Sequence, residues 1–96
     1  MDEIRKKIKN FIAVKEQNCK TIQEVYVIEE CAELIKELCK FQRGKGNDEH
    51  TVEEMADVIG TILTICEMRG YDYELLKQNI IYKLKRGQER LSKGDN

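Results

Sequence analysis

The sequence predicts an all-α protein with four helices. Proline is absent and glycine is sparse, while apolar residues recur at helical spacing almost from end to end. The length of 96 residues gives one domain over 1–96, with a core at about 21–90, and a helical layer of this size buries little apolar surface. We therefore expect a four-helix, bundle-like subunit that oligomerises through apolar helix faces.

The first two helices are predicted over residues 2–17 and 21–43. Asp2 and Glu3 suit the positive end of a helix dipole, and Thr21 and Glu24 have the spacing of a capping box. Both helices carry apolar residues at helical spacing, which are Ile4, Ile8, Phe11, Ile12 and Val14 in the first and Val25, Ile28, Ala32, Ile35, Leu38 and Cys39 in the second. The apolar sector of the second helix is wide enough to need more than one packing partner.

The third helix is predicted over residues 51–69. A break at 44–48 precedes it, Thr51 and Glu54 form another capping-box pattern, and Gly70 supplies a stop. No charged residue occurs between Val58 and Cys66. We therefore expect this helix to be central and covered by protein on nearly every face.

The fourth helix is predicted to open at Asp72, which is a suitable N-cap residue. It carries Asn79, Lys83 and Arg86, and the tail from Ser92 is expected to fray.

Composition and charge argue against several classes of protein. The 17 basic residues are diluted by 18 acidic ones, so the chain lacks the charge of a general nucleic-acid binder. It has no apolar run long enough to span a membrane and no secretion leader, so we expect a cytoplasmic protein that binds no membrane.

The cysteines and the single histidine do not have the spacing of a metal site. Cys19, Cys31, Cys39 and Cys66 lack a C-x-x-C pattern, so we expect buried free thiols. His50 has no Cys or His partner at ligand spacing and is expected at the surface, which argues against a ferritin-like di-iron site.

Two acidic pairs carry the functional prediction. Glu30 and Glu33 lie one turn apart on the second helix, and Glu54 and Asp57 do so on the third. Like charges at this spacing repel, so they need either exposure to water or a compensating cation. Mg²⁺ prefers carboxylate oxygens and commonly completes its shell with substrate phosphates. The pairs therefore predict a magnesium site between two helices, with a polyphosphate held by the metal.

Two alternatives remain open for these acids. Glu54 has the position of a capping-box residue, and the whole set can be a solvated helix face. In that case the chain is a non-catalytic helical oligomerisation module.

The order E-E-x-x-E, then E-x-x-D after a Gly-rich connection, resembles the signature of the MazG-type, all-α nucleoside triphosphate pyrophosphohydrolases. The matching residues are Glu29, Glu30, Glu33, Glu54 and Asp57, and the resemblance covers roughly residues 22–90. It implies a homodimer or homotetramer that hydrolyses (deoxy)nucleoside triphosphates to the monophosphate and pyrophosphate. Phosphoribosyl-ATP pyrophosphohydrolase, in the same superfamily, shares the chemistry and remains an alternative.

The resemblance also implies roles for individual residues. Mg²⁺, for which Mn²⁺ can substitute, would be held by Glu30, Glu33, Glu54 and Asp57. One carboxylate could act as the base, and Glu33 is the candidate through its position alone. Lys83 and Arg86 would contact phosphate oxygens, where cations stabilise developing charge. Asn79, one turn before Lys83, is a candidate for binding the sugar or base.

Overall fold

The protein folds into four helices, which confirms the all-α prediction. A computed structural model describes residues 2–18 and 23–94, and over these residues the regular structure is helical throughout, with no strand. The helices are α1 (Asp2–Asn18), α2 (Gln23–Gln42), α3 (Asp48–Arg69) and α4 (Tyr73–Ser92). None of them is both long enough and apolar enough to cross a membrane.

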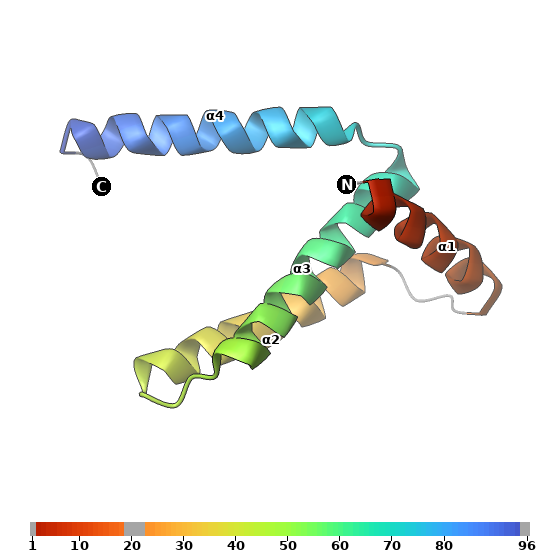
Figure 1. Ribbon diagram of the computed structural model, residues 1–96, viewed down its shortest axis with the longest axis horizontal. Coiled ribbons are helices and arrows are strands. Elements are labelled where there is room, and N and C mark those ends of the chain that lie inside the picture. Colours follow the sequence, from red (N-terminus) through yellow and green to blue (C-terminus); the bar gives the residue numbers. More distant parts are fainter. Residues whose placement is uncertain (1, 19–22, 95–96) are drawn as a thin grey trace.

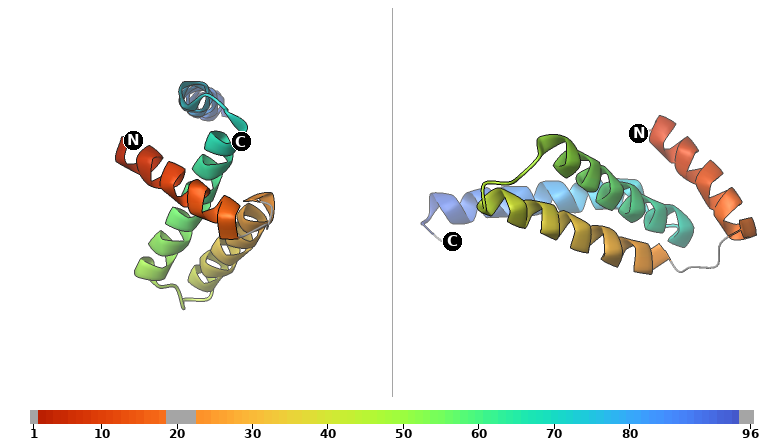
Figure 2. Two further views of the ribbon diagram at one scale, coloured as in Figure 1. Left: turned by 90° about the vertical axis from the view of Figure 1, so that its right-hand side faces the viewer. Right: turned by 90° about the horizontal axis from the view of Figure 1, so that it is seen from below.

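Helices α2 and α3 form an antiparallel hairpin, and α1 crosses α3 (Figures 1 and 2). Helix α3 is thus the central helix, as predicted. Helix α4 extends away from the other three as a separate arm (Figure 1).

The start of α3 differs from the prediction. The N-cap is Asn47, whose side-chain Oδ1 accepts a hydrogen bond from the His50 backbone N–H at 3.0 Å. Thr51, the predicted N-cap, lies inside the first turn, and its hydroxyl donates to the Asn47 carbonyl oxygen at 2.9 Å. Glu54 consequently lies well inside the helix, so its predicted alternative role in a capping box is wrong. The predicted Thr21 cap of α2 lies outside the described residues.

The predicted start of α4 agrees with the structure. Gly70 ends α3 in the left-handed conformation, with φ of 68°, and the Tyr71 backbone N–H then donates to the Cys66 carbonyl oxygen at 2.8 Å. Asp72 caps α4 by accepting a hydrogen bond from the Glu74 backbone N–H at 2.9 Å.

The covered face of α2 carries a polar stripe beside half-buried Val27, Cys31 and Leu34, whereas its predicted apolar sector remains exposed. Gln23 and Glu37 are buried and Glu30 is half-buried, at intervals of seven residues that correspond to two helical turns. In contrast, Ile28 is 69% exposed. All other members of the sector are exposed as well, namely Val25, Ala32, Ile35, Leu38 and Cys39. Within one chain, the prediction that this sector is buried is wrong, because the chain supplies no second partner for it.

Other predicted core residues are exposed as well. In α1, Ile8 is buried and Ile12 is half-buried, whereas Ile4, Phe11 and Val14 are exposed. Helix α3 is not covered on every face, because Ile59 and Ile62 are exposed.

The cysteines have three different environments. Cys66 is buried, Cys31 is half-buried and Cys39 is exposed, while Cys19 lies outside the described residues. The prediction of buried thiols therefore holds for Cys66 and is wrong for Cys39. His50 is exposed, as predicted.

Tyr73 joins α1, α3 and α4. Its hydroxyl lies 3.1 Å from the Leu63 carbonyl oxygen and 3.0 Å from Glu67 Oε2, so its single proton is shared between two acceptors on α3. The Arg5 guanidinium of α1 lies over the tyrosine ring and also contacts Glu67 at 3.2 Å. Burial and the hydrogen bond with Glu67 raise the pKa of Tyr73 to about 12, so the hydroxyl keeps its proton at neutral pH.

We expect Tyr73→Phe to lower the free energy of unfolding by about 1 kcal/mol, because two acceptors on α3 lose their shared donor. Urea denaturation at fixed protein concentration measures the change. Tyr82→Phe is the matched control, because Tyr82 is exposed on the same helix. An equal effect of the two substitutions would contradict the role given to the Tyr73 hydroxyl.

Candidate metal centre

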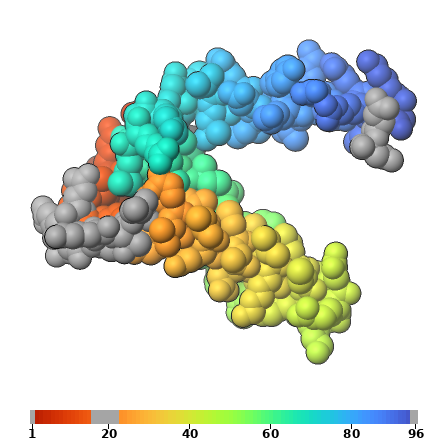
Figure 3. All heavy atoms as spheres, turned by 180° about the vertical axis from the view of Figure 1, so that it is seen from behind, coloured from red at the N-terminus to blue at the C-terminus, as the bar shows by residue number. Residues whose placement is uncertain are grey.

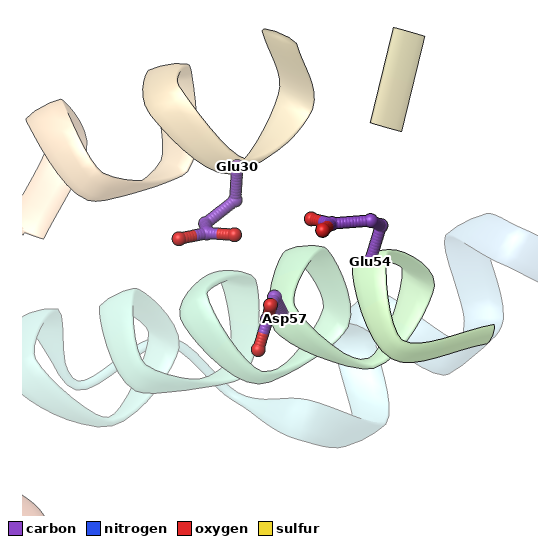
Figure 4. Close-up of side chains that lie close together, drawn as sticks. All are labelled: Glu30, Glu54 and Asp57. Carbon is purple, nitrogen blue, oxygen red and sulfur yellow. The ribbon is translucent and has the colours of Figure 1, made fainter. Parts of the chain in front are cut away.

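Three carboxylates from two helices converge in the α2–α3 hairpin. Glu30 points from α2 toward α3, where Glu54 and Asp57 lie one turn apart (Figure 4). One oxygen from each side chain lies within 4.8 Å of the others. We refer to these three residues as the carboxylate cluster.

The sequence places the cluster there through helical spacing. Glu30 belongs to the polar stripe of α2, so the packing of α2 on α3 directs its side chain toward the neighbouring helix. The three-residue interval between Glu54 and Asp57 puts both on one side of α3. Glu30 and Glu54 are half-buried, whereas Asp57 is exposed.

The cluster carries uncompensated negative charge. Burial, followed by the carboxylates of Asp57 and Glu54, raises the pKa of Glu30. Burial, followed by repulsion from Asp57 and Glu33, raises the pKa of Glu54. A carboxyl group with a raised pKa destabilises the folded state when it is ionised. In the absence of a cation, this contribution to stability therefore improves as the pH falls through the raised pKa.

This donor set fits a small, hard divalent cation. Adjacent oxygens of an octahedral Mg²⁺ shell lie about 3 Å apart and opposite ones about 4 Å apart, so small side-chain rotations suffice to bring the three oxygens onto one ion. Three carboxylates also leave ligand positions for water or phosphate oxygens.

Glu33 lies outside this group. It is exposed on α2, one turn beyond Glu30, and it is close enough to contribute to the raised pKa values of Glu30 and Glu54. Its predicted roles as a ligand and as a base therefore remain predictions.

Glu37, which the sequence analysis left aside, is buried next to the cluster. Its Oε1 accepts a hydrogen bond from Lys40 Nζ at 2.9 Å, and this bond lowers the pKa of Glu37. Lys40 thus compensates the charge of Glu37, whereas no described basic side chain forms an ion pair with Glu30.

The residues predicted to bind substrate lie apart from the cluster within one chain. Asn79, Lys83 and Arg86 are exposed on α4, which diverges from the α2–α3 hairpin (Figure 1). The Asn79 amide donates to the Leu75 carbonyl oxygen one turn earlier on the same helix. All three remain predicted substrate contacts.

A cavity of about 510 Å³ adjoins the cluster between α1 and α3. Asp57 belongs to both the cavity wall and the cluster. The other cavity residues are Glu3, Ile4, Lys7, Ile8 and Phe11 from α1, Gln23 and Tyr26 from α2, and Ala56, Gly60, Thr61 and Thr64 from α3. This volume lies in the range of small-molecule sites.

Comparison with protein families matches residues 17–91 to the MazG nucleotide pyrophosphohydrolase domain. The chain belongs to the MazG family. The match covers most of the chain and confirms the resemblance based on the acidic motifs. No curated protein and no solved structure matches the chain significantly.

One polar residue of the cavity was missed by the sequence analysis. Gln23 lies between the two predicted capping-box residues and was given no role of its own, yet it lines the cavity and is buried. Its spacing of seven residues from Glu30 is the signal that places both on the same stripe of this MazG domain.

We expect Glu30→Gln to raise the melting temperature of the MazG domain in the presence of a chelator, because it removes repulsion within the cluster. The same change should reduce the additional stabilisation by Mg²⁺, because one ligand loses its charge. Thermal unfolding with and without Mg²⁺ measures both effects. Glu29→Gln, an exposed neighbour, is the control and should change neither. Destabilisation by Glu30→Gln in chelator would contradict the repulsion argument.

Proposed function

We propose that this MazG domain hydrolyses nucleoside triphosphates between the α and β phosphates, releasing a nucleoside monophosphate and pyrophosphate. The observation that carries the proposal is the convergence of Glu30, Glu54 and Asp57 from two helices in a chain of this family. Carboxylates this close repel one another, and a cation that also binds phosphate offsets the repulsion.

We propose the following roles for these residues. Glu30, Glu54 and Asp57 would hold Mg²⁺ or Mn²⁺, and Glu33 beside them would accept a proton from the attacking water. A metal ion in this position would neutralise charge on phosphate oxygens. Hydrolysis forms a bond between the water oxygen and phosphorus and breaks the bridging phosphoanhydride bond. Pyrophosphate leaves with the bridging oxygen, and the water oxygen stays on the phosphorus of the nucleoside monophosphate.

We expect Asp57→Asn to lower pyrophosphate release by at least about 100-fold, because it removes a charged ligand of the proposed metal. Pyrophosphate release from a panel of nucleoside triphosphates with Mg²⁺ measures the effect, and circular dichroism checks that the helices remain. Asp48→Asn is the control, because Asp48 is exposed at the start of the same helix.

Three outcomes would contradict parts of this proposal. A near-wild-type rate in Asp57→Asn would exclude Asp57 as an essential ligand. If the wild type neither binds Mg²⁺ nor hydrolyses any member of the panel, the alternative of a non-catalytic oligomerisation module is favoured. Activity restricted to phosphoribosyl-ATP would identify the alternative substrate of the superfamily.

We also propose that the active unit is a homodimer or homotetramer. Among the described residues, the buried apolar side chains are those of Ile8, Leu63 and Cys66. The arm formed by α4 stands clear of the α2–α3 hairpin (Figure 3). It carries exposed apolar side chains at Leu75, Ile80, Ile81, Leu84 and Leu91. Association of copies through α2 and α4 would bury this surface, which one chain leaves in water.

The same association can complete the phosphate site. Lys83 and Arg86 lie on the arm, and the arm diverges from the carboxylate cluster of its own chain. The arm of a second copy is therefore the proposed source of these cations.

A mixture of two inactive variants tests this arrangement. One carries Asp57→Asn, and the other carries Lys83→Ala with Arg86→Ala. If the site is shared between copies, random re-association into dimers leaves one intact site in each mixed dimer, so about a quarter of the wild-type sites return. Pyrophosphate release from the refolded mixture measures the recovery. The absence of recovery, with mixed dimers shown by mass spectrometry, would place each site within one chain.

A further inference from the structure

Glu37 is a buried carboxylate with one unpaired oxygen, in the same α2–α3 interface as the carboxylate cluster. Its side chain is 9% exposed, and Oε1 accepts a hydrogen bond from Lys40 Nζ at 2.9 Å. The other oxygen, Oε2, is buried and has no hydrogen-bond partner among the described residues. Buried polar atoms in folded proteins are nearly always bonded, because an unpaired one lowers stability. Oε2 therefore calls for a donor that these residues do not supply.

The side chains at the start of α3 do not act as this donor. His50 is close enough for its charge to lower the pKa of Glu37, yet His50 is exposed and its ring is not bonded to Oε2. Thr51, the buried residue that follows, donates its hydroxyl proton to the Asn47 carbonyl oxygen at 2.9 Å. A hydroxyl has one proton, so Thr51 has none left for Glu37. The donor is therefore a water or a ligand that enters the interface.

Helical register places Glu37 beside the cluster. Glu30 and Glu37 lie two turns apart on α2, which is about 10 Å along the helix axis. Because α2 and α3 are antiparallel, the step from Glu30 to Glu37 runs from Asp57 past Glu54 toward the start of α3. In agreement with this order, the charge of Glu54 contributes to the raised pKa of Glu30, and the charge of Glu37 to that of Glu54. Glu54 thus lies between the two acids of α2.

A hydrated cation at the cluster would bring the missing donor. Mg²⁺ keeps several of its waters when carboxylates bind it, and these waters donate hydrogen bonds to acceptors about 5 Å from the ion. The interval of about 10 Å between Glu30 and Glu37 is short enough to be bridged by two glutamate side chains and such a water. Acceptors in this outer position orient the ligands of a metal and raise its affinity.

We propose that Glu37 is a positioning residue for the cation, with Oε2 accepting a hydrogen bond from a water of the cation's shell while Lys40 holds Oε1. The proposal rests on the proposed function, because it takes the cation from that assignment. Lys40 compensates the charge of Glu37, so this carboxylate is buried without adding net charge beside the cluster. Glu37 lies outside the E-E-x-x-E and E-x-x-D pattern, so its role does not follow from the family motif.

The first test replaces the ion pair as a unit. Glu37→Leu combined with Lys40→Met removes one charge of each sign, so the net charge beside the cluster stays the same. Apolar residues in place of a buried ion pair often leave a fold equally or more stable, so the melting temperature in chelator should not fall. The dissociation constant of Mn²⁺, measured from the electron paramagnetic resonance signal of the free ion, should nevertheless rise at least about tenfold. Lys40→Met alone keeps Glu37 and should not raise it.

A second variant decides the outcome if the double variant is destabilised. Glu37→Gln keeps the size of the side chain, and its amide oxygen can accept from Lys40, so that the amide nitrogen takes the place of Oε2. We expect the dissociation constant of Mn²⁺ to rise about tenfold again, and the half-saturating Mn²⁺ concentration for pyrophosphate release to rise by the same factor. Glu53→Gln is the matched control, because it removes the same charge at an exposed residue next to Glu54, and it should change the constant less than about threefold.

The outcomes separate the role of Glu37 from the catalytic proposal. Mn²⁺ affinity that depends on Glu37, in a protein that hydrolyses no nucleotide, would support this role and overturn the hydrolase proposal. An unchanged constant in folded Glu37→Gln would overturn the role, identify an ordinary buried water as the partner of Oε2, and leave the hydrolase proposal intact. Equal effects of Glu37→Gln and Glu53→Gln would reveal a general charge effect and also overturn the role. A wild type that binds no Mn²⁺ would overturn both proposals.

Discussion

The structure depends on the packing of α2 against α3 along a face that carries a polar stripe beside half-buried apolar side chains. Gln23, Glu30 and Glu37 recur every two turns, so one helix face brings an amide and two carboxylates to the same interface. An apolar stripe would have stabilised this hairpin more simply. Lys40 compensates the charge of Glu37, while Glu30 meets two further acids. The acidic group therefore lowers the stability of the hairpin, and a cation bound to it would stabilise the fold at this interface.

Local signals predicted the helices well. Four helices could be predicted from the absence of proline, the helical spacing and the breaks at 44–48 and 70–72. Gly70 ends α3 and Asp72 caps α4, as predicted. The acidic spacing also identified all three members of the carboxylate cluster. The start of α3 was misplaced because Thr51-x-x-Glu54 has the form of a capping box, yet Asn47 upstream also caps well. A local sequence pattern does not show whether the helix begins at Asn47 or at Thr51.

Burial was harder to predict, because it depends on contacts that helical spacing does not specify. The wide apolar sector of α2 indicated several packing partners, but not that α3 would take the polar stripe and leave Ile28 and Ile35 in water. The cavity is similarly a product of how α1 crosses α3. For that reason Gln23 appeared in the sequence only as a residue near a helix start. The spacing between Gln23 and Glu30 predicts a shared environment only when it is known which face of α2 packs against α3.

The connection between α3 and α4 determines where the arm lies. Only Gly70, Tyr71 and Asp72 separate the two helices, and Tyr73 fastens the first turn of α4 to α3. The arm has 20 residues and is therefore about 30 Å long. A rotation of about 10° at its base displaces its tip by about 5 Å. Small changes in this short connection would therefore move the arm and change how copies of the chain fit together, while the acidic hairpin keeps its shape.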